Sequence, residues 1–247
     1  AVDSKKNLEM RIGCGSFDTK TPLLTSAIMR MDINPQWIVP RSIIKKSIIP
    51  HLGNRSYFES HNFFVRERST GKKISFDKVT SEMLNSSDYL VVQAGGIGNS
   101  LGRIIFRFNN SFSVFIHDTN QHGVFSQEDR GVSHGCIRVQ KPFSLAMFML
   151  KDKNEDTISK IRYSMVAQIG GESTVMYDEK HEGSSKLKTD TLNHSRIINN
   201  INVNPKVPLF ITYFTLYPDF EGNIKSYSDV YGYDRVIFSI LKNYLGH

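Results

Sequence analysis

The residues with the most distinctive chemistry are one cysteine and two histidines around a short glycine-containing motif. The motif is Ser133-His134-Gly135-Cys136-Ile137-Arg138, and His117 stands upstream of it. A thiolate is a strong nucleophile, but a free cysteine, with a pKa of about 8.5, is mostly protonated at neutral pH. A nearby imidazole can take the proton, which leaves a thiolate–imidazolium pair that attacks carbonyl groups. We therefore interpret Cys136 as a nucleophile and His117 as its general base.

The glycine before the cysteine indicates how the reaction intermediate would be stabilised. Gly135 has no side chain, so a substrate can approach the backbone closely there. The backbone N–H groups of Gly135 and Cys136 would then face the oxyanion that forms when the thiolate attacks. A buried structural cysteine usually lies in an apolar run, whereas Cys136 follows a polar, flexible lead-in. The setting of Cys136 therefore favours a reactive thiol over a core residue.

Predicted strands and helices must position these side chains. The run 112–116 is typical of a strand that ends at His117, and the polar segments 118–123 and 127–131 are typical of loops. Pro142 predicts the start of a helix through Leu150. His117 and Cys136 thus stand at opposite ends of one long loop, an arrangement that suits an active site on a rigid sheet.

Periodicity and capping residues predict the remaining elements. Strands are expected at 8–14, 29–33, 89–93 and 207–217, and a hairpin is expected around Asn109-Asn110. Helices are expected at 41–52 with Ser42 as a cap, at 154–166, and at the end of the chain with Asp234 as a cap. Many strands and few helices predict a mainly β catalytic core.

The motifs together resemble a known family. His117-Asp118-Thr119 followed by Ser-His-Gly-Cys-Ile-Arg resembles the signature of the L,D-transpeptidases, the YkuD-type catalytic domain. Four further segments are similar to parts of the large periplasmic subgroup of that family, and they are 34–43, 99–103, 207–213 and Asp229-Val230-Tyr231-Gly232. Two residues depart from the family pattern. Phe115 stands where many relatives have tyrosine, and Cys14 stands where relatives typically have another residue.

The resemblance implies a fold and a domain organisation. We expect a YkuD-like β-sandwich catalytic core with flanking helices, and one catalytic domain over residues 1–247. Within it, 41–88 is expected to be an inserted helical and loop subdomain that caps the substrate groove; the alternative is a surface elaboration that does not touch substrate. Trp37, the single tryptophan, is either a core anchor or a wall of the substrate cleft.

The resemblance also implies a reaction, which is acyl transfer on peptidoglycan stem peptides. Cys136 would attack the third-residue carbonyl of a tetrapeptide stem and release D-alanine. An amine of a second stem would then take the acyl group and form a 3→3 cross-link. The alternatives are an L,D-carboxypeptidase, which passes the acyl group to water, and a non-catalytic cell-wall-binding module. Carbapenem-type inhibitors are expected to react with the cysteine, and no cofactor is expected.

Residues around the nucleophile have candidate supporting roles. Asp118 is expected to orient the general base, through either its backbone carbonyl or its carboxylate. His134 would shape the oxyanion site or form hydrogen bonds within the loop. Ser133 would position His134 or simply form a turn. Arg138 would bind a stem carboxylate or brace the loop against Asp118 or Glu128.

A zinc site is the competing interpretation of the same histidines and cysteine. Zinc sites usually show short paired spacings such as Cys-x-x-Cys or His-Glu-x-x-His. Neither spacing occurs in the chain, and Cys14 lies far from the motif. We therefore expect no metal. A Cys14–Cys136 disulfide would block the nucleophile, so Cys14 is expected to be an inert, partly buried thiol.

Composition narrows the partners and the location. The formal net charge of +7 indicates an anionic environment or partner. The chain has no basic run or basic-aromatic stripe, so nucleic acid is not expected, and peptidoglycan with its free carboxylates is. No apolar stretch is long enough to span a bilayer, and residues 1–6 do not look like a signal peptide. A periplasmic or cell-envelope location follows from the resemblance. No pattern assigns an oligomeric state.

Overall fold

The computed structural model describes residues 2–3, 6–96, 98–150, 154–167, 176–177, 186–187 and 193–244. The chain forms two compact units. The first unit consists of Ala1–Met31, Phe106–Lys151 and Asn202–His247. The second unit consists of Asp32–Ile105 and Asp152–Ile201. The expected single domain with a capping insertion stays a prediction, and segment 41–88 lies wholly in the second unit.

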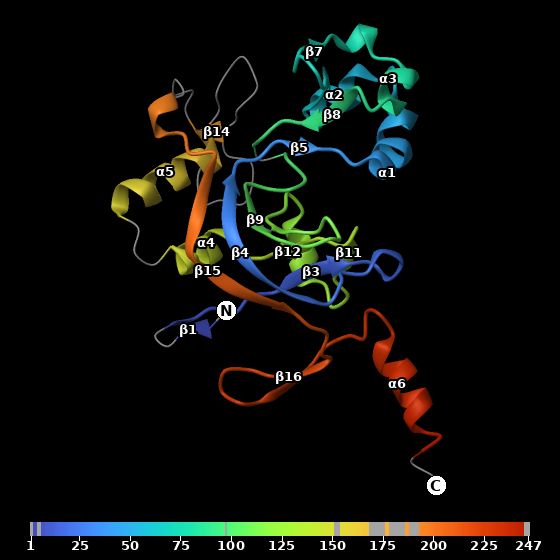
Figure 1. Ribbon diagram of the computed structural model, residues 1–247, viewed down its shortest axis with the longest axis vertical. Helices are drawn as coiled ribbons and strands as arrows, with labels where there is room; N and C mark the ends of the chain where they lie inside the picture. Colours follow the sequence, from blue (N-terminus) through green and yellow to red (C-terminus); the bar gives the residue numbers. More distant parts are fainter. Residues whose placement is uncertain are drawn as a thin grey trace. The chain divides into compact units, whose positions relative to one another are not determined.

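A mixed seven-stranded sheet is the largest element of the fold (Figure 1). Its strand order is β11-β3-β12-β10-β9-β4-β15. The bounds are β11 (Gly131–Ser133), β3 (Ile12–Gly15), β12 (Ile137–Val139), β10 (Ile116–His117), β9 (Ile104–Phe108), β4 (Leu24–Ile33) and β15 (Asn200–Ile211). Strand β12 runs parallel to β10 and antiparallel to β3. The predicted mainly β fold is confirmed.

Local sequence explains the central strands of this sheet. Ile104, Ile105 and Phe106 of β9 have no exposed surface, so this continuous apolar run is typical of a strand covered on both faces. The loop after β9 is organised by Asn110, whose side chain accepts from the backbone N–H of Val114 and donates to its carbonyl. Strands β9 and β10 are neighbours in the sheet, as the predicted hairpin requires.

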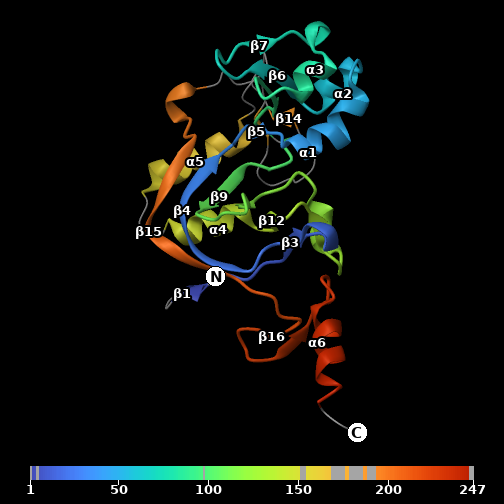
Figure 2. The same cartoon turned by 45° about the vertical axis from the view of Figure 1, so that its right-hand side comes forward.

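Helices and a hairpin complete the first unit. Helix α4 (Pro142–Met149) begins with the proline, as predicted. Short 3-10 turns lie at Phe17–Thr19 and His122–Ser126. An antiparallel hairpin, β16 (Leu216–Pro218) and β17 (Ile224–Ser226), precedes helix α6 (Tyr233–Leu241). In Figures 1 and 2 this segment extends away from strands β3 and β12 of its own unit.

The predicted cap of the last helix is wrong. The N-cap of α6 is Gly232, which has the left-handed conformation that glycine tolerates best. Asp234 lies inside the first turn instead, where its carboxylate accepts a hydrogen bond from the hydroxyl of Thr215. A carboxylate in the first turn still interacts favourably with the helix dipole.

The second unit contains an antiparallel four-stranded sheet in the order β5-β8-β6-β7. The bounds are β5 (Trp37–Ile38), β8 (Tyr89–Gln93), β6 (Phe63–Glu67) and β7 (Lys73–Ile74). Helices α1 (Arg41–Ile43), α2 (Arg55–Ser60) and α3 (Ser81–Asn85) lie close to these strands in Figure 1. Helix α1 continues into a π-helical turn (Ile44–Ile48) and a 3-10 turn (Ile49–His51), and another 3-10 turn lies at Phe76–Lys78. The predicted strand 89–93 is confirmed.

A buried aliphatic and aromatic cluster forms the core of this unit. Its members are all at most 3% exposed, and they are Val39, Ile44, Ile48, Phe58, Val65, Leu84 and Val91. The isoleucines that predicted a helix at 41–52 supply two of them. Ser42 does not cap this helix, because α1 begins at Arg41 and Pro40 is the N-cap. Trp37 is partly buried and packs against the cluster.

Buried amides connect the loops of the second unit. The side-chain amide of Asn99 donates to the carbonyls of Pro35 and Ala94 at 3.0 and 2.9 Å. The amide of Gln93 donates to the carbonyl of His61, and its oxygen accepts from the backbone N–H of Ser100. Asn99 and Gln93 are each 1% exposed. The bond from Asn99 to Pro35 joins 34–43 and 99–103, which are two of the segments that resemble the large subgroup.

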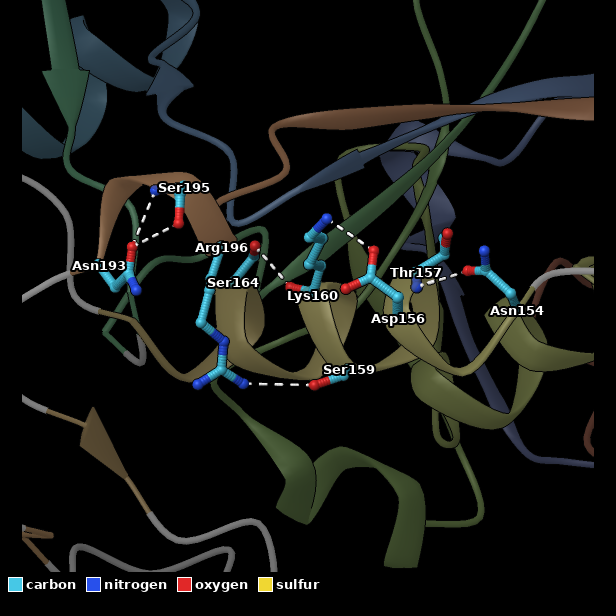
Figure 3. A network of polar contacts seen from close by, with 9 residues as sticks. All are labelled: Asn154, Asp156, Thr157, Ser159, Lys160, Ser164, Asn193, Ser195 and Arg196. Carbon is cyan, nitrogen blue, oxygen red and sulfur yellow. Dashed lines mark hydrogen bonds and ion pairs between the residues drawn. The ribbon is translucent and has the colours of Figure 1, made fainter.

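Polar side chains cap the N-terminus of helix α5 (Glu155–Val166) and form an ion pair on its surface (Figure 3). The side chain of Asn154 caps the N-terminus by accepting from the backbone N–H of Thr157 at 2.9 Å. Lys160 and Asp156 form an ion pair one turn apart. The predicted helix at 154–166 is confirmed, and its cap residue is a preferred one.

Four two-residue strands and one turn are the remaining elements of secondary structure in the described chain. They are β1 (Val2–Asp3), β2 (Lys6–Asn7), β13 (Met176–Tyr177), β14 (Lys186–Leu187) and the 3-10 turn His194–Arg196. No helix within the described ranges is long and apolar enough to cross a membrane.

Candidate active site

Strand register brings the histidine and the cysteine to one face of the sheet. In the parallel pair β10–β12, Ile116 lies opposite Ile137 and His117 lies opposite Arg138. Continued by one residue beyond the start of each strand, this register pairs Phe115 with Cys136, and the carbonyl of Phe115 accepts from the backbone N–H of Ile137 at 3.0 Å. Side chains alternate along a strand. Phe115, His117, Cys136 and Arg138 therefore point to the same face.

The imidazole of His117 is buried and oriented by its neighbour. It is 4% exposed, and its Nδ1 is hydrogen-bonded to the backbone carbonyl of Asp118. A carbonyl oxygen can only accept, so Nδ1 carries the hydrogen and the Nε2 of a neutral ring is left as the acceptor. The ring also meets the edge of Phe115, with centroids 5.6 Å apart. Of the two orienting groups considered for Asp118, the structure shows a contact from the carbonyl.

Opposing effects act on the thiol of Cys136. Burial has the largest effect and raises its pKa. A hydrogen bond from the backbone of Phe115 and the positive charges of Arg107 and Arg138 lower the pKa, but the net direction is upward. The resting group is therefore a thiol at neutral pH rather than a preformed thiolate. Attack on a carbonyl then requires a proton acceptor at the moment of reaction.

Hydrogen bonds hold the loop that carries the cysteine. The hydroxyl of Ser133 donates to the carbonyl of Cys136 at 2.6 Å and accepts from the backbone N–H of Gly135 at 3.1 Å. The carbonyl of Ser133 accepts from the Thr19 hydroxyl and from the backbone N–H of Ser16, both at 2.9 Å. Gly135 has a φ of +113°, a conformation that strains any other residue. The loop therefore has one defined backbone course.

This course differs from the expected oxyanion geometry at one position. The backbone N–H of Gly135 points to the Ser133 hydroxyl, whereas the sequence predicted that it would face the substrate. The hydroxyl of Ser133 therefore holds the loop itself, through Gly135 and Cys136, and its expected positioning of His134 stays a prediction. The backbone N–H of Cys136 is left as the candidate donor to an oxyanion within this motif.

Comparison with known proteins gives the family of this site. The family model of the YkuD L,D-transpeptidase catalytic domain matches residues 2–158, a span that includes β10, the loop and β12. The chain belongs to the L,D-transpeptidase family. It is also 27% identical over 246 residues to a Haemophilus influenzae strain Rd protein named "Putative L,D-transpeptidase". That alignment covers 96% of this chain and 44% of the relative, so the chain spans less than half the relative's length.

Two other predicted site residues lie in this L,D-transpeptidase domain. Arg138 is half-buried, and its guanidinium donates to the side-chain oxygen of Gln121 at 2.8 Å. The expected brace to Asp118 or Glu128 and the substrate-binding role of Arg138 both stay predictions. His134 is exposed on the loop. Trp37 belongs to the second unit, where it packs against the core, and its contact with substrate also stays a prediction.

The two cysteines point to opposite faces of the sheet. In the antiparallel pair β12–β3, Arg138 lies opposite Gly13. That register places Cys14 opposite Ile137 and Gly15 opposite Cys136, and neighbouring residues in a strand face opposite ways. Both thiols are free, and both are partly exposed. The alternating geometry rules out a Cys14–Cys136 disulfide without moving the backbone.

Sequence reasoning missed two residues of this site. Arg107 of β9 places its guanidinium 4.9 Å from the ring centroid of Phe115 and lowers the pKa of Cys136. The sequence did offer one indication of this role, which is that Arg107 is the single charged residue in the otherwise apolar run 104–108. Thr21 donates from its hydroxyl to the carbonyl of Gly135 at 2.9 Å. Nothing in the sequence near Thr21 indicated this contact. Among the described residues, no group of three or more His, Cys, Asp or Glu could hold a metal.

Proposed function

We propose that the protein is a cysteine-dependent peptidoglycan L,D-transpeptidase in the cell envelope. Cys136 is the nucleophile and His117 is the general base. The observation that supports this proposal is the pairing of β10 with β12, because Cys136 directly precedes β12 and β10 ends at His117, whose Nδ1 is already bonded to a carbonyl. The family supplies the substrate class, which is the tetrapeptide stem of peptidoglycan.

The first half-reaction forms a thioester and releases D-alanine. The Sγ of Cys136 attacks the third-residue carbonyl carbon while the thiol proton passes to Nε2 of His117. The carbonyl electrons move to its oxygen, and the backbone N–H of Cys136 stabilises the resulting oxyanion. As the tetrahedral intermediate collapses, the C–N bond breaks and His117 returns the proton to the leaving amine. The raised pKa of the thiol makes this concerted proton transfer necessary.

The second half-reaction regenerates the free thiol and joins two stem peptides. The side-chain amine of a neighbouring stem attacks the thioester carbon, and His117 accepts a proton from that amine. The C–S bond breaks, the acyl group moves to nitrogen, and the proton returns to sulfur. The product is a 3→3 cross-link. Arg138, which is half-buried and interacts electrostatically with the thiol, would hold a stem carboxylate.

Covalent labelling tests the nucleophile. Intact-mass spectrometry after incubation with a carbapenem should give one adduct on the wild-type protein and none on Cys136→Ala. Cys14→Ala is the matched control, because its thiol lies on the opposite face, and it should keep the adduct. An adduct that persists in Cys136→Ala would contradict the proposal by showing another nucleophile. No adduct on folded wild-type protein would also contradict it and would favour a binding module.

Product analysis tests the fate of the acyl group. Purified disaccharide-tetrapeptide should yield cross-linked dimers together with free D-alanine. A tripeptide product without dimers would instead assign an L,D-carboxypeptidase, which shares the first half-reaction and passes the acyl group to water. Addition of excess acceptor amine separates the two reactions, since only a transpeptidase transfers the acyl group to it in preference to water.

A further inference from the structure

A tyrosine near the end of the chain is linked to the nucleophile loop through one threonine. The motif Asp229-Val230-Tyr231-Gly232 lies outside residues 2–158, which match the family domain, yet it belongs to the same compact unit as Cys136. The hydroxyl of Tyr231 accepts from the backbone N–H of Thr21 at 3.0 Å. The hydroxyl of Thr21 in turn donates to the carbonyl of Gly135 at 2.9 Å.

The Thr21 hydroxyl has only one orientation that satisfies its neighbours. Its oxygen accepts from the backbone N–H of Gly15 at 2.9 Å, which is a group that can only donate. Its single hydrogen is therefore committed to the carbonyl of Gly135. Thr21 is 6% exposed, so water does not readily replace either bond. Both Gly15 and Gly135 are buried as well.

Fixing the Gly135 carbonyl also fixes the direction of the next N–H group. The peptide that joins Gly135 to Cys136 is planar, and in a trans peptide its C=O and N–H point in opposite directions. The bond from Thr21 therefore turns the backbone N–H of Cys136 away from Thr21. This N–H is the donor that the proposed function assigns to the oxyanion, and its direction decides how well it stabilises that charge.

Tyr231 is itself held from several sides. Its ring stacks on Tyr213 with centroids 5.1 Å apart, and its backbone N–H donates to the Tyr213 hydroxyl at 3.1 Å. Lys20 donates to its carbonyl at 3.2 Å. Burial and a hydrogen bond with the Cys14 thiol raise the pKa of Tyr231 to about 12. The hydroxyl therefore keeps its proton at neutral pH, and its lone pair stays available to the N–H of Thr21.

We infer that Thr21 and Tyr231 are positioning residues for the acyl-transfer reaction. Thr21 orients the Gly135–Cys136 peptide for oxyanion stabilisation, and Tyr231 holds Thr21 in place from the C-terminal segment. This inference rests on the proposed function of Cys136. It makes residues beyond the matched family domain a functional part of the catalytic unit.

Two reagents separate positioning of the oxyanion donor from general damage to the site. Iodoacetamide alkylates the thiol by displacement at carbon and forms no oxyanion. An activated ester such as p-nitrophenyl acetate acylates the same thiol through a tetrahedral oxyanion. The ratio of the acylation rate constant to the alkylation rate constant therefore reports the oxyanion donor, while effects on thiol access and thiol pKa are shared by both reactions.

Thr21→Val removes the hydroxyl at nearly constant volume, and Thr21→Ser keeps it. Loss of a well-oriented oxyanion donor costs about 10²-fold or more in rate, so the ratio should fall by about 10-fold to 10²-fold in Thr21→Val, since the donor is misdirected rather than removed. Thr21→Ser should restore the wild-type ratio. A Thr21→Val ratio equal to that of wild type, or acylation and alkylation lowered by the same factor, would overturn the inference.

Tyr231→Phe provides a second test that keeps the ring and its packing. The ratio should fall by about threefold to tenfold, because Thr21 loses one of its supports while keeping its own bond to Gly135. Tyr217→Phe is the matched control in the same segment, since that side chain is 56% exposed, and it should leave the ratio unchanged. An unchanged ratio in Tyr231→Phe would overturn the part assigned to the C-terminal segment, even if Thr21→Val fails to fold.

The wild-type reactions keep the two proposals apart. If p-nitrophenyl acetate labels wild-type protein but not Cys136→Ala, the nucleophile is correct and the variants above judge the inference alone. If the wild-type protein is alkylated but never acylated, the proposed function fails first, and the inference fails with it.

Discussion

The loop around Cys136 and the core of the second unit are held together in different ways. Short directional bonds hold the loop: Ser133 and Thr21 each satisfy two backbone groups, and Gly135 takes a left-handed conformation. The second unit is held by apolar packing around Phe58, Leu84 and their neighbours, which are almost fully buried. Hydrogen bonds are directional, whereas the hydrophobic effect depends mainly on buried area.

The loop and the second core therefore contribute differently, the loop to the orientation of reactive groups and the core to stability. Directional bonds add modest net stability, about 0.5–1.5 kcal/mol each, but they set the orientation of the groups that they join. Apolar burial contributes about 1.5–3 kcal/mol for a large side chain and tolerates small shifts. Substitutions in the loop should therefore change reactivity more than stability, and substitutions in the second core should do the reverse.

The largest effect is expected at His117, which tests the reactive side of the comparison. His117→Gln should lower the rate of Cys136 acylation by about 10²- to 10⁴-fold, since it removes the base that the proposed function assigns to the thiol proton. The melting temperature should change little. Exposed His194, changed to Gln, is the control. Acylation by His117→Gln at the wild-type rate would show that another base serves the thiol.

Phe58→Ala tests the stability side of the comparison. Removing this ring, which is 2% exposed, should lower the free energy of unfolding by about 3–5 kcal/mol. Urea denaturation measures that loss. Acylation of Cys136 by a small ester, measured below the unfolding transition, should stay near the wild-type rate. A large fall in that rate would show that the second core also controls the thiol.

Two glycines with positive φ sharpen the comparison, because only one belongs to the site. Gly135 and Gly71 have φ values of +113° and +71°, so an alanine should cost stability at both, about 1–3 kcal/mol. Only Gly135→Ala should also slow acylation, by about 10²-fold. Gly71 has nothing near an added Cβ and is the control. Equal acylation rates in the two variants would contradict the assigned role of the loop backbone.

The smallest effect is expected at Arg107, through the pKa of the thiol. Burial already raises the pKa of Cys136, and Arg107 partly offsets that rise. Arg107→Met should therefore shift the pH midpoint of iodoacetamide alkylation further upward and slow alkylation at neutral pH severalfold. Exposed Arg55, changed to Met, should leave the pH profile unchanged. A downward shift in Arg107→Met would contradict the electrostatic assignment.

Local patterns in the sequence were enough to predict several strands and helices. The apolar run 89–93, Pro142 at a helix start and Asn154 before the 155–166 helix each act within a few residues, and the structure has them as expected. Two predicted caps, Ser42 and Asp234, were wrong. A cap depends on where the chain enters the helix, and Pro40 and Gly232 determine that entry.

The family was readable from the sequence alone, and so were the proposed nucleophile and its candidate base, because they depend on residue types at short spacing. The tertiary structure decided how these groups are oriented. It joined Nδ1 of His117 to the carbonyl of Asp118, turned the N–H of Gly135 toward Ser133, and placed Thr21 beside Gly135, 114 residues away in sequence. The contact of Thr21 with Gly135 forms only when segments distant in sequence come together, and the two local contacts depend on the backbone course of the loops. Neither composition nor local periodicity encodes these geometries.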